Sequence, residues 1–489
     1  MTGKAHGMKN RRQPNIIYIL SDEHRGQAMG HTGDPNIQTP AMDRLAEEGA
    51  SFARAYANCP VCTPSRGTLF SGRHAHAGPV ANFFDVYKPA SPSTATVLRE
   101  HGYRTAYFGK WHCGVIRDQV PDSVKENPDA YPGRPIRTPE SFRGGFQDWC
   151  AFEVINGPFQ SYVYRNDDTD PTRLEGFQTD ALTNLALDYL RNYDRDEPLF
   201  LVLSVEPPHF PCTPPEAFKR FDPQSLKVRP NFGGLSPFFA AGTSPEIDGS
   251  TLRRILANYY GMVENLDWNI GRFVEELRQW PQFENTLLVY TSDHGDYVGS
   301  HGLRTTKTHH HEESVRIPAI FHWPGHIPAQ GKIDGMFSLV DLFATTLGLA
   351  GLPVPPYNQG TDFSPALRGE DFTPPDAVLL EMAGVPRWNP RFQDWRGLTT
   401  ERWKYAYCED GRQSLFDLEA DPFEMDDIAG KCPEVCAELK QRLLGMLADS
   451  REPYFDVIME HGVKPPEPVR YLTDTANLTR VARKQGGLE

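Results

Sequence analysis

The sequence predicts an α/β protein in which a mostly parallel sheet is flanked by helices, followed by a smaller C-terminal α+β domain. Short apolar runs of strand length alternate with longer helical patterns, which is typical of βαβ units. The chain has 489 residues, of which 39% are hydrophobic, and this is enough for one large core and a smaller unit. Ionisable residues directly follow several of the apolar runs. The pattern therefore predicts the fold class and a single functional edge of the sheet.

Four predicted strands end in ionisable side chains. They are residues 16–20 before Asp22, 105–108 before Lys110 and His112, 199–205 before Glu206 and His209, and 286–290 before Asp293 and His294. In open α/β sheets, ligands bind beyond the carboxyl ends of the strands. We therefore expect these side chains to converge on one site.

Two core-facing helices are predicted between the strands, over residues 181–193 and 252–280, because their apolar residues recur at helical spacing. A Pro-containing stretch at 371–376 is typical of a junction, and shorter apolar runs and turns follow it. The predicted organisation is a flexible N-terminus over 1–14, a catalytic domain over 15–375, and a C-terminal α+β domain with a tail over 376–489.

Composition limits the partners. The net charge is −14, from 50 basic and 64 acidic residues, which argues against nucleic acid or an anionic membrane as the main partner. An anionic substrate would need a locally basic pocket. No run approaches the length of a membrane span. The polar N-terminus has no apolar signal core, so a cytoplasmic location is expected, or a periplasmic or secreted one if a signal had been removed. The eight cysteines show no disulfide pattern.

The segment Cys62-Thr63-Pro64-Ser65-Arg66 is the most informative part of the chain. Pro64 suits the first position of a helix and Gly72 can end it, so Cys62 is expected at a helix N-terminus. The free N–H groups and positive dipole at such an end favour a bound anion. Arg66 adds a guanidinium whose geometry suits sulfate or phosphate oxygens. The segment therefore predicts an anion-binding site at Cys62.

Other interpretations of Cys62 are a buried structural cysteine, or a redox or metal pair with Cys59. A lone CxxC pair is weak support for either chemistry. A zinc site needs further ligands at suitable spacing, and Cys113, the next cysteine, has no companion nearby. These interpretations stay open at the level of the sequence.

The motifs, taken in order, resemble the formylglycine-dependent (type I) sulfatase family of the alkaline phosphatase superfamily. The segments that carry the resemblance are 15–22, 39–45, 62–72, 102–112, 207–209, 292–295, 312–318, 415–418 and 421–422. The resemblance implies an alkaline-phosphatase-like fold and hydrolysis of a sulfate monoester. It also implies that a formylglycine-generating enzyme oxidises Cys62 to formylglycine.

The resemblance further implies a metal site. Asp22, Asp293, His294 and an oxygen of the modified Cys62 would hold one divalent ion. Calcium is expected, with manganese or magnesium as alternatives, because carboxylate oxygens suit hard ions and an imidazole suits borderline ones. Glu23 stands where the family often has Asp, Asn or Gln, and whether it ligates the metal or only hydrogen-bonds stays open.

The mechanism that the resemblance implies is an in-line attack on sulfur by a hydroxyl of the formylglycine hydrate, with Asp293 accepting its proton. His209 is expected to protonate the leaving oxygen, with Lys307 as a possible helper, because an imidazole titrates near neutrality. His112 would accept the proton that accompanies sulfate release. Three cations are expected to stabilise charge on the transferring group: Arg66, Lys110 and Lys307. Arg304 is an alternative to Lys307.

The run from His309 to His311 is left out of the site, because consecutive side chains do not converge on one ion. Aromatic and Arg residues that could contact the leaving group lie in residues 82–84, 142–164 and 387–392. A carbohydrate sulfate is the preferred substrate, and an aryl or alkyl sulfate is the alternative. Residues 480–484 could form an arm in a homo-oligomer.

Two other functions are weighed against a sulfatase. Phosphonate or phosphate ester hydrolases of the same superfamily share the modified cysteine and the Asp-His pair, but the pair of Lys110 and His112 resembles sulfatases more. An inactive binding homologue is the third possibility, and no expected catalytic position is missing from the sequence.

Overall fold

The structure is a computed structural model that describes residues 13–82, 85–114, 136–153, 157–233, 249–302, 307–382, 394–408 and 411–450. Several predictions fall outside these residues. They concern Arg304, residues 83–84, 154–156, 387–392 and 480–484, and most of the N-terminal segment.

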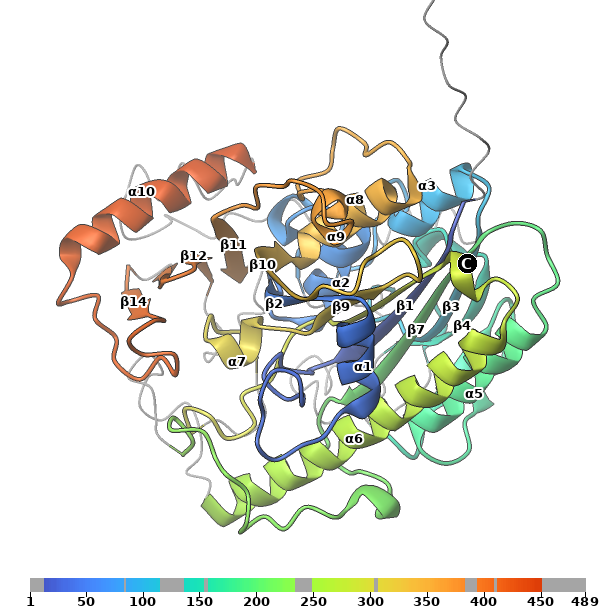
Figure 1. The fold of residues 1–489 in the computed structure, drawn as a ribbon, viewed down its shortest axis with the longest axis horizontal. Helices are drawn as coiled ribbons and strands as arrows, with labels where there is room; N and C mark the ends of the chain where they lie inside the picture. The colour runs from blue at the N-terminus through green and yellow to red at the C-terminus, as the bar shows by residue number, and fades with distance from the viewer. Residues whose placement is uncertain are drawn as a thin grey trace, which may run out of the picture.

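The described residues form a ten-stranded main sheet (Figure 1). Its strands, in spatial order, are β10 (Gly331–Ser338), β2 (Ala50–Tyr56), β9 (Ala319–His322), β8 (Thr286–Ser292), β1 (Asn15–Asp22), β7 (Leu199–Pro208), β3 (Arg104–Lys110), β4 (Asp148–Phe152), β5 (Tyr162–Arg165) and β6 (Thr172–Arg173). The five central strands from β8 to β4 are parallel to one another. Only β9, β5 and β6 pair in the antiparallel sense within this sheet as described. The predicted fold class is confirmed.

Helices cover both faces of the sheet. They are α1 (Pro40–Glu48), α2 (Cys62–Ser71), α3 (Thr94–Glu100), α5 (Gln178–Arg191), α6 (Gly249–Gln279), α7 (Glu312–Val315), α8 (Leu339–Ala350) and α9 (Ser364–Leu367). The two predicted helices correspond to α5 and α6. Figure 1 shows α1, α5 and α6 on one side of the sheet, with α2, α8 and α9 on the other. The sheet is therefore the middle layer of three.

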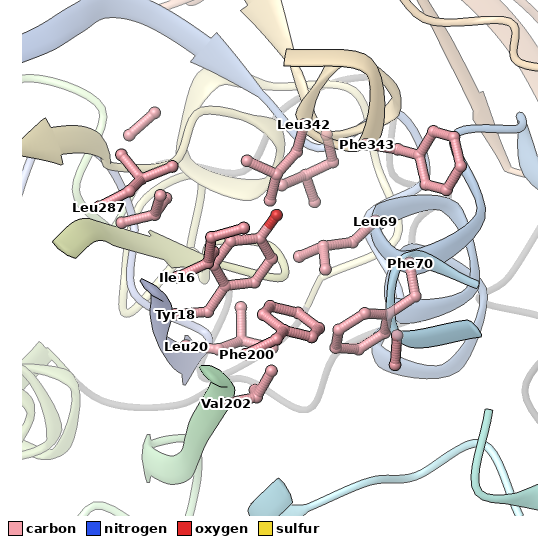
Figure 2. Packing of buried hydrophobic residues seen from close by; sticks show 14 of the residues in the cluster. Ile16, Tyr18, Leu20, Leu69, Phe70, Phe200, Val202, Leu287, Leu342 and Phe343 are labelled. Atoms are coloured by element: carbon pink, nitrogen blue, oxygen red, sulfur yellow. The ribbon is translucent and has the colours of Figure 1, made fainter. Parts of the chain in front are cut away.

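Strand β1 explains why both faces need a cover, because its side chains alternate and all of them are buried. Ile16, Tyr18 and Leu20 belong to the core that α2, α3 and α8 complete. Ile17 and Ile19 belong to the core that α1, α5 and α6 complete. Figure 2 shows the first core, where residues from α2 and α8 lie over side chains of the central strands: Leu69, Phe70, Leu342 and Phe343.

Helix α2 begins at Cys62, as predicted, with extended Val61 as its N-cap. Pro64 is its third residue and not its first, which the helix tolerates because that position also lacks an intrahelical N–H partner. Gly72 ends the helix in a left-handed conformation, with φ 63°. The local sequence therefore fixes the position of Cys62 at the helix N-terminus.

A second, antiparallel sheet follows the main sheet in the chain. It contains β11 (Ala377–Met382), β12 (Trp395–Thr400), β13 (Trp403–Cys408) and β14 (Gln413–Asp417), and α10 (Pro433–Asp449) packs on one face. Its other face shares a core with β2, α7 and β10. The predicted small α+β unit is confirmed, and its predicted boundary at residue 375 stays a prediction.

Two further observations bear on the composition. All eight cysteines lie in the described residues, and none of them forms a disulfide bond there. None of the helices in the described part of the chain combines the length and hydropathy that a membrane span requires.

One buried ion pair connects the second sheet to the short helix Ala75–Ala77 that follows α2. Glu381 of β11 is 2.7 Å from His76 Nδ1 and accepts a hydrogen bond of 2.7 Å from the backbone N–H of Ala75. Both ionisable side chains are fully buried. Burial alone would raise the pKa of Glu381, but His76 and then Arg396 lower it to about 2. The carboxylate is therefore charged at neutral pH, and its charge is compensated locally.

Glu381→Gln tests this junction. A carboxyl group whose pKa falls from 4.5 to about 2 on folding contributes stability above pH 4.5, and this contribution is lost as the pH falls toward 2. The shift is equivalent to roughly 3 kcal/mol at neutral pH. We expect the variant to have a lower free energy of unfolding than the native protein at about pH 7, and a flatter profile below about pH 5. Urea denaturation across this range measures both.

Glu401→Gln is the matched control, because Glu401 pairs with Arg54 at 2.7 Å while its side chain is 71% exposed. Exposed pairs contribute little to stability. A loss of equal size in both variants would contradict the assignment to the buried junction.

Candidate active site

Cys62 lies at the centre of the converging strand ends. Its Sγ is 3.2 Å from His294 Nε2, 3.3 Å from Lys307 Nζ and 3.6 Å from Asp22 Oδ1. The side chain is fully buried. Burial, and then the Asp22 carboxylate, raises the pKa of the thiol well above its ordinary value. The unmodified thiol is therefore a poor nucleophile here, because the thiolate is the reactive form.

Four side chains could hold a metal ion. Ligand atoms of Asp22, Cys62, Asp293 and His294 all lie within 4.8 Å of one another, and all four residues are buried. His294 Nε2 is 3.7 Å from Asp22 Oδ1 and 3.8 Å from Asp293 Oδ1. His294 Nδ1 is 2.9 Å from the carbonyl of Gly295, which assigns the ring proton to Nδ1 and leaves the Nε2 lone pair facing the group. Two carboxylates and an imidazole nitrogen are a donor set that fits a divalent cation.

Arg66 holds the two carboxylates in place. Its Nε donates to Asp293 Oδ2 at 2.8 Å, and its Nη2 donates to Asp22 Oδ2 at 3.2 Å. Its Nη1 donates to the carbonyl of Lys110 and to Ser204 Oγ. The guanidinium and both carboxylates are fully buried. The sequence predicted a fork for sulfate oxygens, whereas the structure directs these donors to protein oxygens. Oδ1 of each Asp faces the metal-ligand group, and Asp293 Oδ1 also accepts from the backbone N–H of His294 at 2.9 Å.

Lys110 emerges from the end of β3 between two carboxylates. Its Nζ is 2.7 Å from Asp22 Oδ2 and 3.0 Å from Glu206 Oε1. Burial would lower the pKa of Lys110, but Asp22 and then Glu206 raise it above its ordinary value. Gly109 makes this exit possible, since it has φ 105° and a Cβ there would meet the Ser204 carbonyl oxygen at 1.9 Å.

Glu23, His209 and Lys307 form a second group beside Cys62. Lys307 Nζ donates to Glu23 Oε1 and lies 3.1 Å from His209 Nε2. Glu23 Oε2 accepts from the backbone N–H of Phe210 at 3.3 Å. Burial would raise the pKa of Glu23, but His209 and Lys307 lower it to about 2. The Glu23 carboxylate pairs with Lys307, and Glu23 also has a ligand atom within 4.8 Å of ligand atoms of Asp22 and His209. Ligation of the metal by Glu23 therefore stays a prediction.

The predicted acid, His209, has different protonation from that expected. Its Nδ1 is 2.5 Å from the carbonyl of Phe210, which assigns the proton to Nδ1. Nε2 then accepts from Lys307. Burial lowers the pKa of His209 to about 3, so the ring is neutral at neutral pH. The expectation of titration near neutrality is therefore wrong here, and the spare proton of the pair lies on Lys307.

His112, two residues beyond Lys110, is 3% exposed and has a positive φ of 54°. Burial, followed by the charges of Lys110 and Arg66, holds the pKa of its imidazole well below the ordinary value. His112 is therefore neutral, as a proton acceptor must be.

The consecutive histidines diverge, as predicted. His310 Nε2 is 2.6 Å from Ser414 Oγ, whereas His311 Nδ1 is 2.7 Å from the Tyr297 hydroxyl. A nearby group of three buried residues also has ligand atoms within 4.8 Å of one another: His301, Glu313 and Glu424. Arg229 lies 2.9 Å from one of its carboxylates and Lys404 lies 2.9 Å from the other, so these charges are already compensated by the protein.

Two acidic residues of the site were missed as site residues in the sequence. Glu206 was recognised only as a strand end, and Gln178 at the start of α5 holds its second oxygen at 3.1 Å. Glu153 directly follows β4 and accepts from the backbone N–H of Gly114 at 3.3 Å. Burial raises the pKa of Glu153 to about 7. Both residues could have been found by the position of an ionisable residue at the end of a strand. For Glu153 this failed because β4 begins with Asp148 and is too short to be recognised by its apolar pattern.

Known proteins with similar sequences share most of the length of the chain. Residues 14–352 match the family model described as Sulfatase, and residues 299–449 match the C-terminal region of N-sulphoglucosamine sulphohydrolase. The ulvan-active sulfatase of Formosa agariphila is 31% identical over 427 residues, which cover 86% of this chain and 78% of that protein. The N-acetylglucosamine-6-O-sulfatase of Bacteroides thetaiotaomicron is 25% identical over 520 residues, covering 91% and 87%.

The chain belongs to the sulfatase family of the alkaline phosphatase superfamily. It is a sulfuric ester hydrolase, and this family membership implies a divalent metal ion and a formylglycine.

Solved structures share the fold. The protein BT4656, determined with its substrate D-glucosamine-2-N,6-O-disulfate, has a TM-score of 0.76 at 23% identity and covers 91% of this chain and 99% of its own. The phosphonate monoester hydrolase of Agrobacterium radiobacter has a TM-score of 0.69 at 21% identity, covering 90% and 96%. At these identities the similarity shows the fold alone, and the expected alkaline-phosphatase-like architecture is confirmed.

Asp293→Asn tests the metal-ligand group. The change keeps the size of the side chain but removes the charge of one donor. We expect the affinity for a divalent ion to fall by at least about tenfold, since metal sites depend on each charged ligand. Elemental analysis after dialysis against limiting metal measures the bound ion. Asp267→Asn is the control, because Asp267 is also a buried Asp but bonds to the backbone of α1. Equal metal loss in both variants would contradict the assignment.

Proposed function

We propose that the protein removes sulfate from a carbohydrate sulfate ester by means of a formylglycine made from Cys62 and one divalent ion, with calcium as the expected ion. The observation that carries this proposal is the position of Cys62 Sγ within 3.6 Å of Asp22, His294 and Lys307. A buried thiol with a raised pKa has no evident use among these charges, whereas a hydrated aldehyde oxygen would be bonded by all three.

The metal fits the residues present. Asp22, Asp293 and His294 would hold it together with an oxygen at position 62, and when bound it supplies positive charge to the sulfate oxygens. The hydrate of formylglycine supplies the attacking hydroxyl. Asp293 is the proposed acceptor of a proton from position 62, since its carboxyl group has an oxygen within 4.8 Å of Cys62 Sγ, and burial and then the Asp22 charge raise its pKa.

Lys307 is the proposed donor to the leaving oxygen. It is protonated, lies 3.3 Å from Cys62 Sγ, and is oriented by Glu23 and by the neutral His209 ring. Donors aimed at developing charge in a water-poor site contribute much of the catalysis in such enzymes. His112, which is neutral, is the proposed proton acceptor for release of sulfate.

The carbohydrate preference is supported by two relatives whose names specify ulvan and N-acetylglucosamine 6-O-sulfate. An aryl or alkyl sulfate is the alternative leaving group. The formylglycine-generating enzyme as maturation partner, the homo-oligomer and the cytoplasmic location stay predictions.

The deciding experiment is the mass of the tryptic peptide spanning residues 55–66, taken from protein made in its native host. Conversion of Cys62 removes one sulfur and two hydrogen atoms and adds one oxygen, and we expect this form. Cys62→Ala should abolish sulfatase activity. An unmodified thiol in fully active enzyme would refute the proposed nucleophile.

Lys307→Ala tests the donor. We expect kcat for an alkyl or carbohydrate sulfate to fall by about 10²-fold or more, in the range found when a single charge-stabilising donor is removed. The loss should be smaller for 4-nitrophenyl sulfate, whose leaving oxygen needs little stabilisation. Steady-state kinetics on both substrates measure the difference. Lys219→Ala, at an exposed lysine that pairs with Glu216, should leave both rates unchanged. Equal losses on the two substrates would exclude Lys307 as the donor.

A further inference from the structure

The segment that carries Lys307 is bonded to the second sheet through Trp395 and to the residues before Cys62 through Pro60. Thr308, the next residue, is 3% exposed and has φ 90°, a conformation that costs energy for a β-branched residue. Its N–H donates to the carbonyl of Pro60 at 3.2 Å, close to Cys62 in the chain. Its carbonyl accepts from the indole N–H of Trp395 at 2.8 Å. The residue adjacent to the proposed donor is therefore bonded on both sides.

Trp395 is itself rigid. It is the first residue of β12, is 1% exposed, and pairs with Met382 on one side and Cys408 on the other. Its side chain belongs to the core that joins the second sheet to β2 and α7. Its ring centroid is 5.5 Å from that of His310, which is anchored to Ser414 of β14. Strand pairing and core packing therefore fix the ring of Trp395 so that its indole N–H points at the Thr308 carbonyl.

We propose that Trp395 is a positioning residue for the hydrolysis, because its bond to the Thr308 carbonyl fixes the backbone from which Lys307 reaches the leaving oxygen. The inference rests on the proposed role of Lys307. A lysine side chain has four rotatable bonds, so its Nζ can be held near Cys62 only if its backbone is fixed. Displacements of about 1 Å in a catalytic group cost large factors in rate. The second sheet therefore contributes to catalysis through the backbone of Thr308.

Trp395→Phe is the first test, because it removes the N–H and keeps an aromatic ring. We expect kcat for an alkyl or carbohydrate sulfate to fall by about tenfold, the size expected for one hydrogen bond. KM should stay near the native value, and kcat for 4-nitrophenyl sulfate should change much less. Trp403→Phe is the matched control, since Trp403 lies on the neighbouring strand β13 and stacks with Arg402. It should leave both rates unchanged.

A double-mutant cycle separates positioning from general destabilisation. In the Lys307→Ala background, Trp395→Phe should cause no further loss on the alkyl sulfate, because the group it positions is absent. The formylglycine content of every variant is measured by peptide mass, so that incomplete maturation is corrected for. If Trp395→Phe does not fold, replacement of Trp395 by benzothienylalanine keeps the ring shape and still removes the N–H.

The outcomes distinguish the two proposals. If Lys307→Ala shows no dependence on the leaving group, the role of Lys307 fails and the inference fails with it. If Lys307→Ala shows that dependence but Trp395→Phe lowers both substrates equally, or adds its full loss in the Lys307→Ala background, then only the positioning role of Trp395 is refuted.

Discussion

The site depends on the burial of Arg66 between Asp22 and Asp293. Two carboxylates that are fully buried and close together repel one another and lose their hydration, which is prohibitive without a paired cation. Arg66 bonds to one oxygen of each through two different nitrogens. Its remaining bonds reach the carbonyl of Lys110 and the Ser204 hydroxyl, so a single planar group connects strands β1, β3, β7 and β8. The Arg66 guanidinium therefore compensates the charges of Asp22 and Asp293 and also holds the ends of these strands together.

The second sheet completes the arrangement from outside. Trp395 bonds to Thr308, Glu381 binds the short helix after α2, and Lys404 binds Glu312 of α7 at 2.7 Å. The contact of Glu381 reaches the segment that follows helix α2, which begins at Cys62. The contact of Trp395 reaches the segment of Lys307. A catalytic loop that lies between two sheets is held more firmly than one that lies over a single sheet edge.

The sequence predicted what depends on local pattern. The strands before Asp22, Lys110, His209 and Asp293 were recognisable because apolar runs end there, and parallel strands bring those ends together. It did not predict the neutral state of His209, because the pKa depends on burial by segments distant in the chain. It did not predict that Arg66 bonds to Asp293, which is 227 residues away in the chain. It also did not predict that Trp395 bonds to Thr308, which is 87 residues away. Glu206 lies near the end of β7 and Glu153 directly follows β4, but their partners come from elsewhere in the chain.

The charges of the site also favour a sulfate ester over a phosphate monoester. Four carboxylates, Asp22, Glu23, Glu206 and Asp293, stand against three cations, Arg66, Lys110 and Lys307. Burial, followed by the Glu23 charge, raises the pKa of Asp296, and burial raises the pKa of Glu153 to about 7. The positive charge that the side chains offer a substrate is therefore small. A sulfate monoester carries a single negative charge, so it needs less compensating positive charge in a buried site than a phosphate monoester dianion does. A chain with a net charge of −14 thus gathers three cations, Arg66, Lys110 and Lys307, at the site where an anionic ester would bind.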